Sequence, residues 1–465
     1  MKNKIILLAI SILYAILFYN NNLGLNVIIF TTILLLHLYY FFKNNKLIKN
    51  KFGLLFMIPI FILSLTFLIY DNYFKILNIL IIPLLYLFMY MFTIKPVYNI
   101  TVILDDLLSL AFEPLSYIGS FSKDTVSSLE KNTKITEKDK KLVKSFITII
   151  PVIIVVLYLL LSADEMFLDL FKKFTIFFED FDIKTVIITI LMASVMFIYL
   201  GSTLKYLKEK YKTLYKTEPN KIKIEDMTVK MLLTVLNVIY VIFDFIQINS
   251  LLLKNVSENI NYASYAREGF LQLTIISVIN ISVILLSKRC KENNYIKISS
   301  IIMSFLTLII IFSSLGRMYL YECAYGYTFL RLLVYVALIT EIILLIPTII
   351  YILNNKENNY IFKRYAIIIM SVYSLINLFS PDKIIANKNI ERYYNDKKLD
   401  IIYLMNDNYD NINILMDLYE KTDDEIIKKN LKHYFEFTKK ELNDDNIFEF
   451  NFSKNEAKKI LRDFN

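Results

Sequence analysis

The chain has few of the residues from which metal and phosphate sites are usually built. Its 465 residues include two histidines, two cysteines, seven glycines and no tryptophan. His37 and His433 have no second metal-ligating side chain near them in the sequence, so we expect no metal site. A glycine-rich phosphate loop, a nucleophile elbow and a kinase signature are all missing. We therefore expect no cofactor, and any reaction would depend on carboxylates, arginines and tyrosines.

Long apolar runs are what the chain has in abundance. It is 56% hydrophobic with a mean hydropathy of +0.49, whereas soluble domains are roughly 45–50% apolar. About 20 apolar residues are needed to cross a bilayer as a helix. The runs predict an all-α, polytopic transmembrane helical bundle in the cell membrane, with the lipid bilayer as its main partner. The first and last runs are short enough to be interfacial instead. The eleven expected spans are 5–19, 23–42, 52–70, 73–94, 146–163, 183–204, 229–253, 270–287, 298–315, 332–353 and 365–380.

The positive charges predict how the chain threads through the membrane. With the N-terminus in the cytoplasm, 29 of the 52 Lys and Arg residues fall on the inner side, 8 on the outer side and 15 after residue 380. Inner connections are expected to be basic, so we predict an N-in, C-out topology. This distribution also accounts for the net charge of +9 without nucleic acid. The segment after residue 380 carries 15 basic and 18 acidic residues, which argues against a nucleic-acid surface.

Composition divides the chain into four parts. Residues 1–94 are expected to form four N-terminal spans, and residues 95–145 a cytoplasmic connection that is first amphipathic and then charged. Residues 146–380 are expected to form a seven-helix membrane core, and residues 381–465 a small helical domain outside the cell. Within the core, the connection 164–182 places phenylalanines at helical spacing opposite acids. That pattern predicts a helix in the outer interface, with a loop packed on the bundle as the alternative.

Local signals predict several helix ends. The Glu113-Pro114 step should end the amphipathic helix of the cytoplasmic connection, because a residue before proline disfavours helical angles. In the C-terminal domain, helical spacing extends over 384–394 and 410–442. Ser453 followed by Glu456 resembles a capping box for a last helix over 455–464.

Polar residues gather at the expected outer ends of the spans. The stretch 317–331 joins two apolar runs and contains two arginines, one glutamate and four tyrosines. At about 100° per residue, a continuous helix places Glu322 roughly 140° from Arg317 and 180° from Arg331. We therefore expect Glu322 to pair with Arg267, and Glu268 to pair with Arg317 or Arg331. The alternative is that the arginines reach lipid headgroups and the tyrosines form an interfacial belt. The candidate outer polar cluster is Asp164, Arg267, Glu268, Arg317, Tyr321, Glu322, Tyr325 and Arg331.

Three polar residues lie deeper in the apolar runs. Asp244, Asn280 and Glu341 fall within the expected seventh, eighth and tenth spans. Ionisable groups at such depth often mark ion or proton paths, but they also bond neighbouring helices. Cys290 and Cys323 are expected on opposite sides of the membrane, so they cannot pair with each other.

Short motifs in the second part of the chain resemble a known family. They are Ser162–Phe167, Tyr265–Phe270, Arg317-Met318 with Leu320-Tyr321, Tyr325–Thr328 with Arg331-Leu332, Ile385-Ala386, Asn389–Tyr393, Leu399-Asp400 and Tyr403-Leu404. In this order they are similar to a bacterial membrane family catalogued as domain of unknown function 4173, related to 4153. The resemblance covers roughly residues 146–465 and implies a polytopic bacterial membrane protein. It implies no reaction or ligand.

Three classes of function are compatible with these patterns. The favoured one is a non-enzymatic protein of the cell envelope, a sensor, assembly or transport component, whose outer cluster binds an envelope protein or a small ligand. The second is a membrane-embedded enzyme acting on lipid-linked or cell-wall substrates, with Asp164, Glu268 or Glu322 as acid or base. The third is an ion- or proton-coupled transporter that uses Asp244 and Glu341. Transporters often have two related halves with broken helices, and the sequence has no such repeat.

Overall fold

The computed structural model describes residues 2–95, 103–130, 183–211, 225–252, 262–288, 293–354, 358–405, 409–442 and 446–464. The expected span 146–163 and the expected interfacial helix 164–182, with Asp164, lie outside these residues. So do the side chains of Arg267 and Glu268, although the helix that carries them is described. All the elements in the described ranges are helical.

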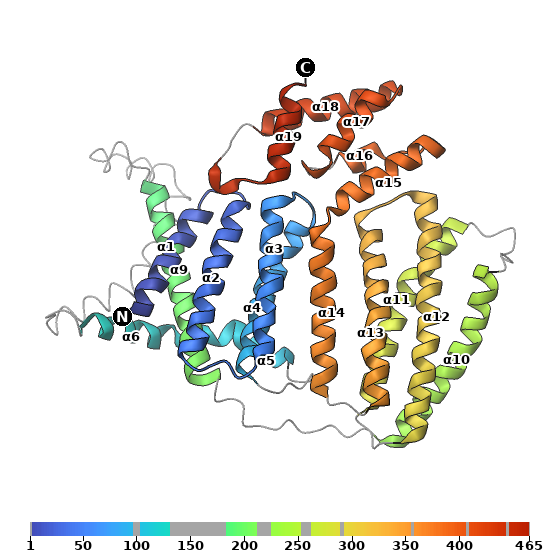
Figure 1. Ribbon diagram of the computed structural model, residues 1–465, viewed down its shortest axis with the longest axis horizontal. Helices are drawn as coiled ribbons and strands as arrows, with labels where there is room; N and C mark the ends of the chain where they lie inside the picture. The colour runs from blue at the N-terminus through green and yellow to red at the C-terminus, as the bar shows by residue number, and fades with distance from the viewer. Residues whose placement is uncertain are drawn as a thin grey trace, which may run out of the picture.

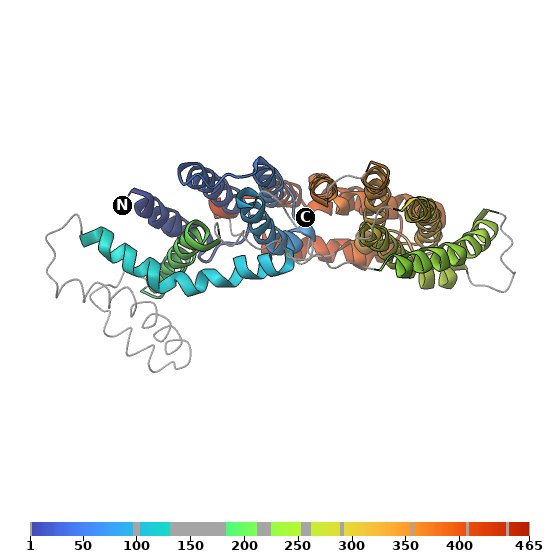
Figure 2. The same ribbon diagram turned by 90° about the horizontal axis from the view of Figure 1, so that it is seen from below.

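The long helices stand side by side in two groups (Figure 1). The N-terminal group consists of α1 (Lys2–Phe18), α2 (Leu25–Asn44), α3 (Met57–Ile69), α4 (Phe74–Ile94) and α9 (Ile183–Tyr206). The second group consists of α10 (Asp226–Leu252), α11 (Tyr262–Ser287), α12 (Asn294–Tyr325) and α13 (Phe329–Leu353), with α14 (Asn358–Leu378) between the two groups. Helix α14 packs against α13 on one side and α3 on the other. Seen along the helices, the array is elongated (Figure 2).

Nine helices in the described part of the chain are long and apolar enough to cross a membrane. They support the prediction of a multi-pass membrane protein. Helix α1, at 17 residues, is apolar but shorter than these nine. Helix α12 is 32 residues long and extends past the expected span 298–315 to Tyr325. The continuous helix assumed for residues 317–331 is wrong, because α13 begins only at Phe329. The helix accommodates Gly316 and the polar side chains that follow it, and it ends at Gly326, where the backbone adopts a left-handed angle.

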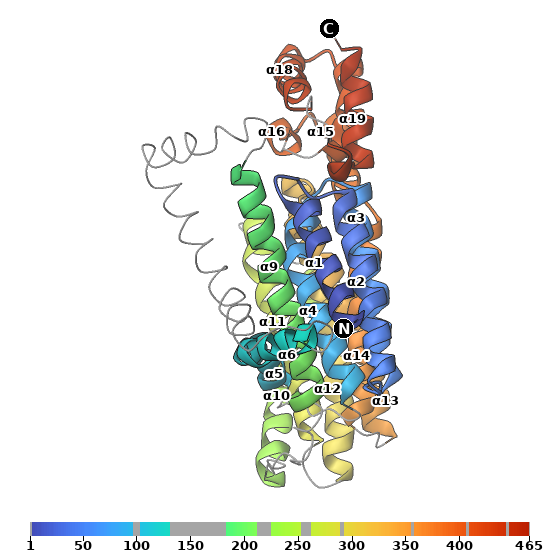
Figure 3. The same ribbon diagram turned by 90° about the vertical axis from the view of Figure 1, so that its left-hand side faces the viewer.

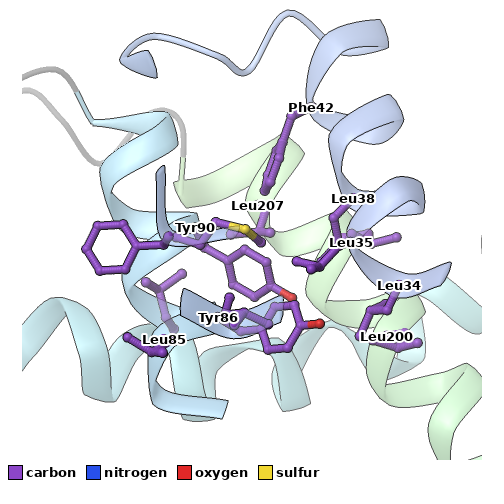
Figure 4. Packing of buried hydrophobic residues seen from close by; sticks show 14 of the residues in the cluster. Leu34, Leu35, Leu38, Phe42, Leu85, Tyr86, Tyr90, Leu200 and Leu207 are labelled. Atoms are coloured by element: carbon purple, nitrogen blue, oxygen red, sulfur yellow. The ribbon is translucent and has the colours of Figure 1, made fainter. Parts of the chain in front are cut away.

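The N-terminal group is held by aromatic and leucine side chains. Phe42 of α2 meets Tyr90 of α4 edge-on, with ring centroids 6.0 Å apart. Leu38 and Leu207 close the same cluster (Figure 4). Inside a bilayer such contacts stabilise through van der Waals packing, since lipid tails are as apolar as leucine.

Two shorter helices lie across one end of this group. They are α5 (Ile103–Phe112) and α6 (Ile118–Glu130), joined by a 3₁₀ turn that begins at Glu113. Helix α5 therefore ends before Glu113-Pro114, as predicted. Figures 1 and 3 show α6 beside the start of α1, crossing the long helices. We call this end of the array the base face and the opposite end the cap face.

The helices after Pro381 form a small domain over the cap face, here called the cap (Figure 3). It contains α15 (Pro381–Asp396), α16 (Ile401–Leu404), α17 (Ile412–Lys421), α18 (Glu425–Glu441) and α19 (Phe452–Arg462). Its core includes Leu415, Leu431, Phe435 and Leu461.

The helical spacing over 410–442 corresponds to two helices, α17 and α18, because Asp424 accepts from the backbone N–H groups of Ile426 and Ile427 and starts α18. One local prediction for the cap is wrong. The last helix is capped by Asn451, which accepts from the N–H of Lys454. Ser453 instead donates to the carbonyl of Ile69 in α3, so Ser453 and Glu456 form no capping box.

Candidate functional site

The turn between α12 and α13 is the centre of the stretch 317–331. Helix α12 ends where Gly326 adopts a φ of 82°, a left-handed angle that favours glycine. A Cβ at this position would lie 2.7 Å from Oδ1 of Asn389 and 2.8 Å from a guanidinium nitrogen of Arg392. Thr328 then caps α13 by accepting from the N–H of Arg331 at 3.5 Å. The turn thus combines a special backbone angle with close approach of the cap.

The cap binds this turn through backbone-directed hydrogen bonds. The amide of Asn389 in α15 donates to the carbonyl of Tyr327 and accepts from its N–H, both at 2.8 Å. Arg392 donates to the carbonyl of Ala324 at 2.7 Å. We call these contacts the cap junction. They account for two of the motifs in the sequence, since Tyr325–Thr328 and Asn389–Tyr393 meet in space.

A third motif completes the cap junction. Tyr403 of α16 accepts from the backbone N–H of Phe329 through its hydroxyl at 2.8 Å. Asp400 accepts from the N–H of Tyr403 at 3.0 Å and so fixes the short helix that carries this tyrosine. Hydrogen bonds to backbone groups fix the position of the cap without depending on the side chains of the turn.

Three members of the expected outer cluster lie together. The guanidinium of Arg331 lies 4.3 Å from the ring centre of Tyr321 and 6.0 Å from that of Tyr325. The two tyrosine rings are 5.1 Å apart, and Phe270 stacks on Tyr321 at 6.0 Å. A cation over aromatic faces is attracted by their negative π-systems. Arg331 also donates to the carbonyl of Gly326, so this cluster supports the same turn.

Glu322 and Arg317 each have a neutral partner. The hydroxyl of Tyr335 in α13 donates to Glu322 at 2.8 Å. Arg317 donates to the side-chain oxygen of Gln247 in α10 at 3.0 Å, and that oxygen also accepts from Ser313 at 2.8 Å. The expected pairs with Arg267 and Glu268 involve side chains outside the described residues and stay predictions.

The three deeper polar residues have different surroundings. Asn280 accepts from the hydroxyl of Tyr240 at 2.7 Å and donates to Thr307 at 3.1 Å. Glu341 accepts from Ser277. Asp244 is 3% exposed, and neither of its carboxylate oxygens has a hydrogen-bond partner among the described residues. Of these three buried polar side chains, Asp244 is therefore the one whose loss of hydration is least offset by hydrogen bonds from the described residues.

These residues belong to a polar stripe that runs through the second helix group. The buried face of α12 supplies most of it, from the base face to the cap face: Ser299, Ser300, Ser304, Thr307, Ser313, Ser314 and Arg317. Small hydroxyl side chains let helices approach closely and bond across the interface. Sequence reasoning missed Gln247, although it lies three residues after Asp244 and so on the same face of α10.

An acidic cluster lies where α14 passes into the cap. Asp410 accepts from the N–H of Asp71 in the α3–α4 connection at 2.7 Å and from the hydroxyl of Ser380 at 2.6 Å. Asp382 is 4% exposed beside them. Burial, and then the charges of Asp410 and Asp71, raise the pKa of Asp382 to about 7, and a hydrogen bond from its own backbone N–H opposes this only in part.

The cap also holds the N-terminal group. Asn451 donates to the carbonyls of Phe67 and Tyr70, both at 2.8 Å. The N–H of Leu25 donates to the carbonyl of Phe450 at 3.0 Å. One end of the cap is thus bound to α2 and α3, and the other end to the α12–α13 turn. Within the described ranges, no group of three His, Cys, Asp or Glu side chains has the geometry to hold a metal ion.

Comparison with known proteins gives one family. The model of the domain of unknown function DUF4153 matches residues 30–418. The chain belongs to this family. The DUF4153 match begins in α2 and ends in α17, so it also covers most of the N-terminal group, where the sequence motifs pointed only to residues after 146. No curated protein and no solved structure matches the chain.

Proposed function

We propose that this DUF4153 protein is a non-enzymatic sensor or assembly component of a bacterial cell membrane, with its cap outside the cell. In this proposal the cap binds an envelope partner or a small ligand, and the cap junction passes the change to α12 and α13. The order of the motifs also supports a relation to domain of unknown function 4173.

The observation that carries the proposal is the cap junction. Asn389 holds both backbone groups of Tyr327, so a displacement of α15 must displace the turn between α12 and α13. These two helices carry Arg317, Glu322 and Glu341. A movement of the cap therefore reaches buried polar groups through hydrogen bonds to backbone, a contiguous physical route of the kind that coupling requires.

Hydrogen exchange tests the coupling in the purified full-length protein. The variant N389A/R392A removes two of the three side chains of the cap junction and leaves Tyr403 in place. Lys454→Ala is the control on the other side of the cap, where the backbone N–H of that residue bonds Asn451. We expect faster amide exchange in α12 and α13 toward the base face in the double variant, and no change in the control. Unchanged exchange in α12 and α13 of a variant whose α15 exchanges freely would disprove the relay.

The proposed sidedness has a test that uses the protein's own cysteines. Cys323 is exposed near the end of α12 at the cap face, and Cys290 lies beyond the other end of the same expected span in the sequence. In a Cys290→Ser variant, a membrane-impermeant maleimide applied to intact cells should label Cys323. The control Cys323→Ser, which keeps Cys290, should be labelled only after the cells are opened. If Cys323 is also labelled only after the cells are opened, the cap lies in the cytoplasm.

Ion- or proton-coupled transport is the second candidate, and Asp244 favours it. A carboxyl group that is buried in a spanning helix without a hydrogen-bond partner among the described residues is costly, and function is one reason to keep it. The test is proton flux in proteoliposomes under an imposed pH gradient. Transport predicts a flux that Asp244→Asn abolishes, whereas a structural or sensory role predicts the background leak in both proteins.

A further inference from the structure

A groove near the base face lies outside the outer cluster and the polar stripe. It has a volume of about 740 Å³ and lies between α1, α2, α6 and α9. Along α1 its wall extends from Asn3 to Leu13, ten residues or about 15 Å at 1.5 Å per residue. The hydrocarbon core of a bilayer is about 30 Å thick, so the groove is about one leaflet deep.

The wall of the groove is mainly apolar. Leu7, Ile10 and Leu13 line it from α1, and Ile33 and Phe41 line it from α2. At its floor α6 approaches α9 so closely that a Cβ at Gly201 would overlap the ring of Phe121. The described residues thus form a half-open trough lined mainly by aliphatic and aromatic groups.

Charged groups gather at the mouth of the groove, at its base-face end. Lys4, Lys205 and Lys208 line the mouth together with Asp124 and Glu209. Lys205 pairs with Asp124 at 2.5 Å and lies 3.9 Å from Glu209, while the side chain of Lys208 is exposed. Among the described lining residues, three ammonium groups against two carboxylates leave one net positive charge at the mouth.

One further polar atom lies deeper in the groove. His37 lines the wall from α2, and its Nε2 atom is buried with no hydrogen-bond partner among the described residues. It lies seven residues, or about 10 Å, along α2 from Asn44, which lines the mouth. A polar group at that depth, below the charged mouth, corresponds to the ester region of a lipid and not to its headgroup.

We propose that this groove binds one anionic phospholipid, with an acyl chain against α1 and α2 and the phosphodiester at the three lysines. The single negative charge of a phosphodiester matches the single excess positive charge at the mouth. The depth of the groove matches one leaflet, and the unpaired nitrogen of His37 is placed to bond an ester oxygen. Free phosphate would contact only the charged residues at the mouth and would leave the apolar wall of the groove without a ligand.

Lipid binding to the full-length protein in detergent tests the site. Phosphatidylglycerol and phosphatidylcholine with the same acyl chains are titrated and bound lipid is counted by native mass spectrometry. We expect tighter binding of phosphatidylglycerol and a loss of that preference of roughly 25-fold in K4Q/K208Q, because each of the two lysines contributes of the order of a fivefold gain in affinity for an anionic lipid. The control K49Q/K51Q removes the same charge from the α2–α3 connection, outside the groove, and should retain the preference.

Two further measurements separate lipid binding in the groove from the binding of phosphate at its mouth. His37→Leu preserves the apolar wall and should weaken the binding of both lipids by the same factor, because the ester region is common to them. Inorganic phosphate at the concentration of the lipid should not compete. Equal binding of the two lipids by the wild type, an equal loss in both double variants, or displacement of the lipid by phosphate would each overturn the proposal. An unchanged melting temperature of K4Q/K208Q without lipid shows that a loss of binding is not a loss of folding.

Discussion

We expect the attachment of the cap to depend on pH through Asp382. It is the second residue of α15 and is 4% exposed, and its Oδ2 atom has no hydrogen-bond partner in the described part of the chain. Burial and the neighbouring carboxylates of Asp410 and Asp71 raise its pKa from the ordinary 3.8 to about 7. Lys75 forms an ion pair with Asp71.

The sign follows from proton binding. Because the folded protein holds the proton of Asp382 up to about pH 7 and the unfolded chain releases it near pH 3.8, folding takes up a proton between these values. The free energy of unfolding therefore falls as pH rises from about 4 to 7 and is constant above that range. At about 1.4 kcal/mol for each tenfold change in proton affinity, the full effect is at most about 4 kcal/mol. About 2.5 kcal/mol of it develops between pH 5 and pH 8.

The substitution Asp382→Asn replaces the protonated acid by a neutral group of the same shape. We expect the variant to be more stable than the wild type at pH 8, to equal it near pH 4 and to lose most of the pH dependence. The measurement is hydrogen exchange or limited proteolysis of α15–α19 at pH 5 and pH 8 in the full-length protein. Asp423→Asn, an exposed aspartate in the same domain, is the control and should follow the wild type.

Three results would refute this reasoning, and two of them leave the sign untested. One is a wild-type cap whose protection is the same at pH 5 and pH 8. Another is an Asp382→Asn variant that keeps the slope of the wild type, which would assign the dependence to another group. A cap that becomes more protected as pH rises would reverse the sign and exclude the raised pKa of Asp382 as the cause.

Three further substitutions test contacts in the second helix group. Asn389→Ala leaves two backbone groups of the turn without their partner and should cost roughly 1–3 kcal/mol, measured as faster proteolysis of the cap, with exposed Lys388→Ala unaffected. Gly326→Ala adds a strained angle of roughly 1–2 kcal/mol and a clash, so it should release the cap further; a stable Gly326→Ala cap would contradict the turn geometry. Gln247→Leu removes the acceptor of Ser313 and Arg317 and should lower the melting temperature of the purified protein, whereas Gln247→Glu, which keeps the acceptor, should not.

The sequence predicted the membrane helices well because hydropathy is a local property. Ten of the eleven expected ranges coincide with helices, and the other range, 146–163, lies outside the described residues. It missed the turn at Gly326, because the angles between Arg317, Glu322 and Arg331 were worked out for a continuous helix. Polarity marks where a helix leaves the bilayer, and not where its backbone stops.

The partners of the candidate residues were much harder to predict. Arg317 bonds Gln247, 70 positions away, and Tyr327 bonds Asn389, 62 positions away. Helical spacing showed which faces these residues occupy, but the neighbouring face depends on how whole helices are arranged. The sequence motifs nevertheless contained both sides of the cap junction, and only the fold shows that they belong to one contact.

The cap is bound at two distant places, and this has a mechanical consequence. Asn451 ties it to the α3 end of the N-terminal group, and Asn389 ties it to the turn of the second group. Between the two groups lies α14, beside a cavity of about 440 Å³ lined almost entirely by apolar side chains, and near the cap face Phe329 of α13 packs directly on Phe74 of α4. The cap therefore connects the two helix groups across the line along which they meet. Any spreading of the two groups in the plane of the membrane, whether by tension or by a change in bilayer thickness, puts the cap under load at its two attachments.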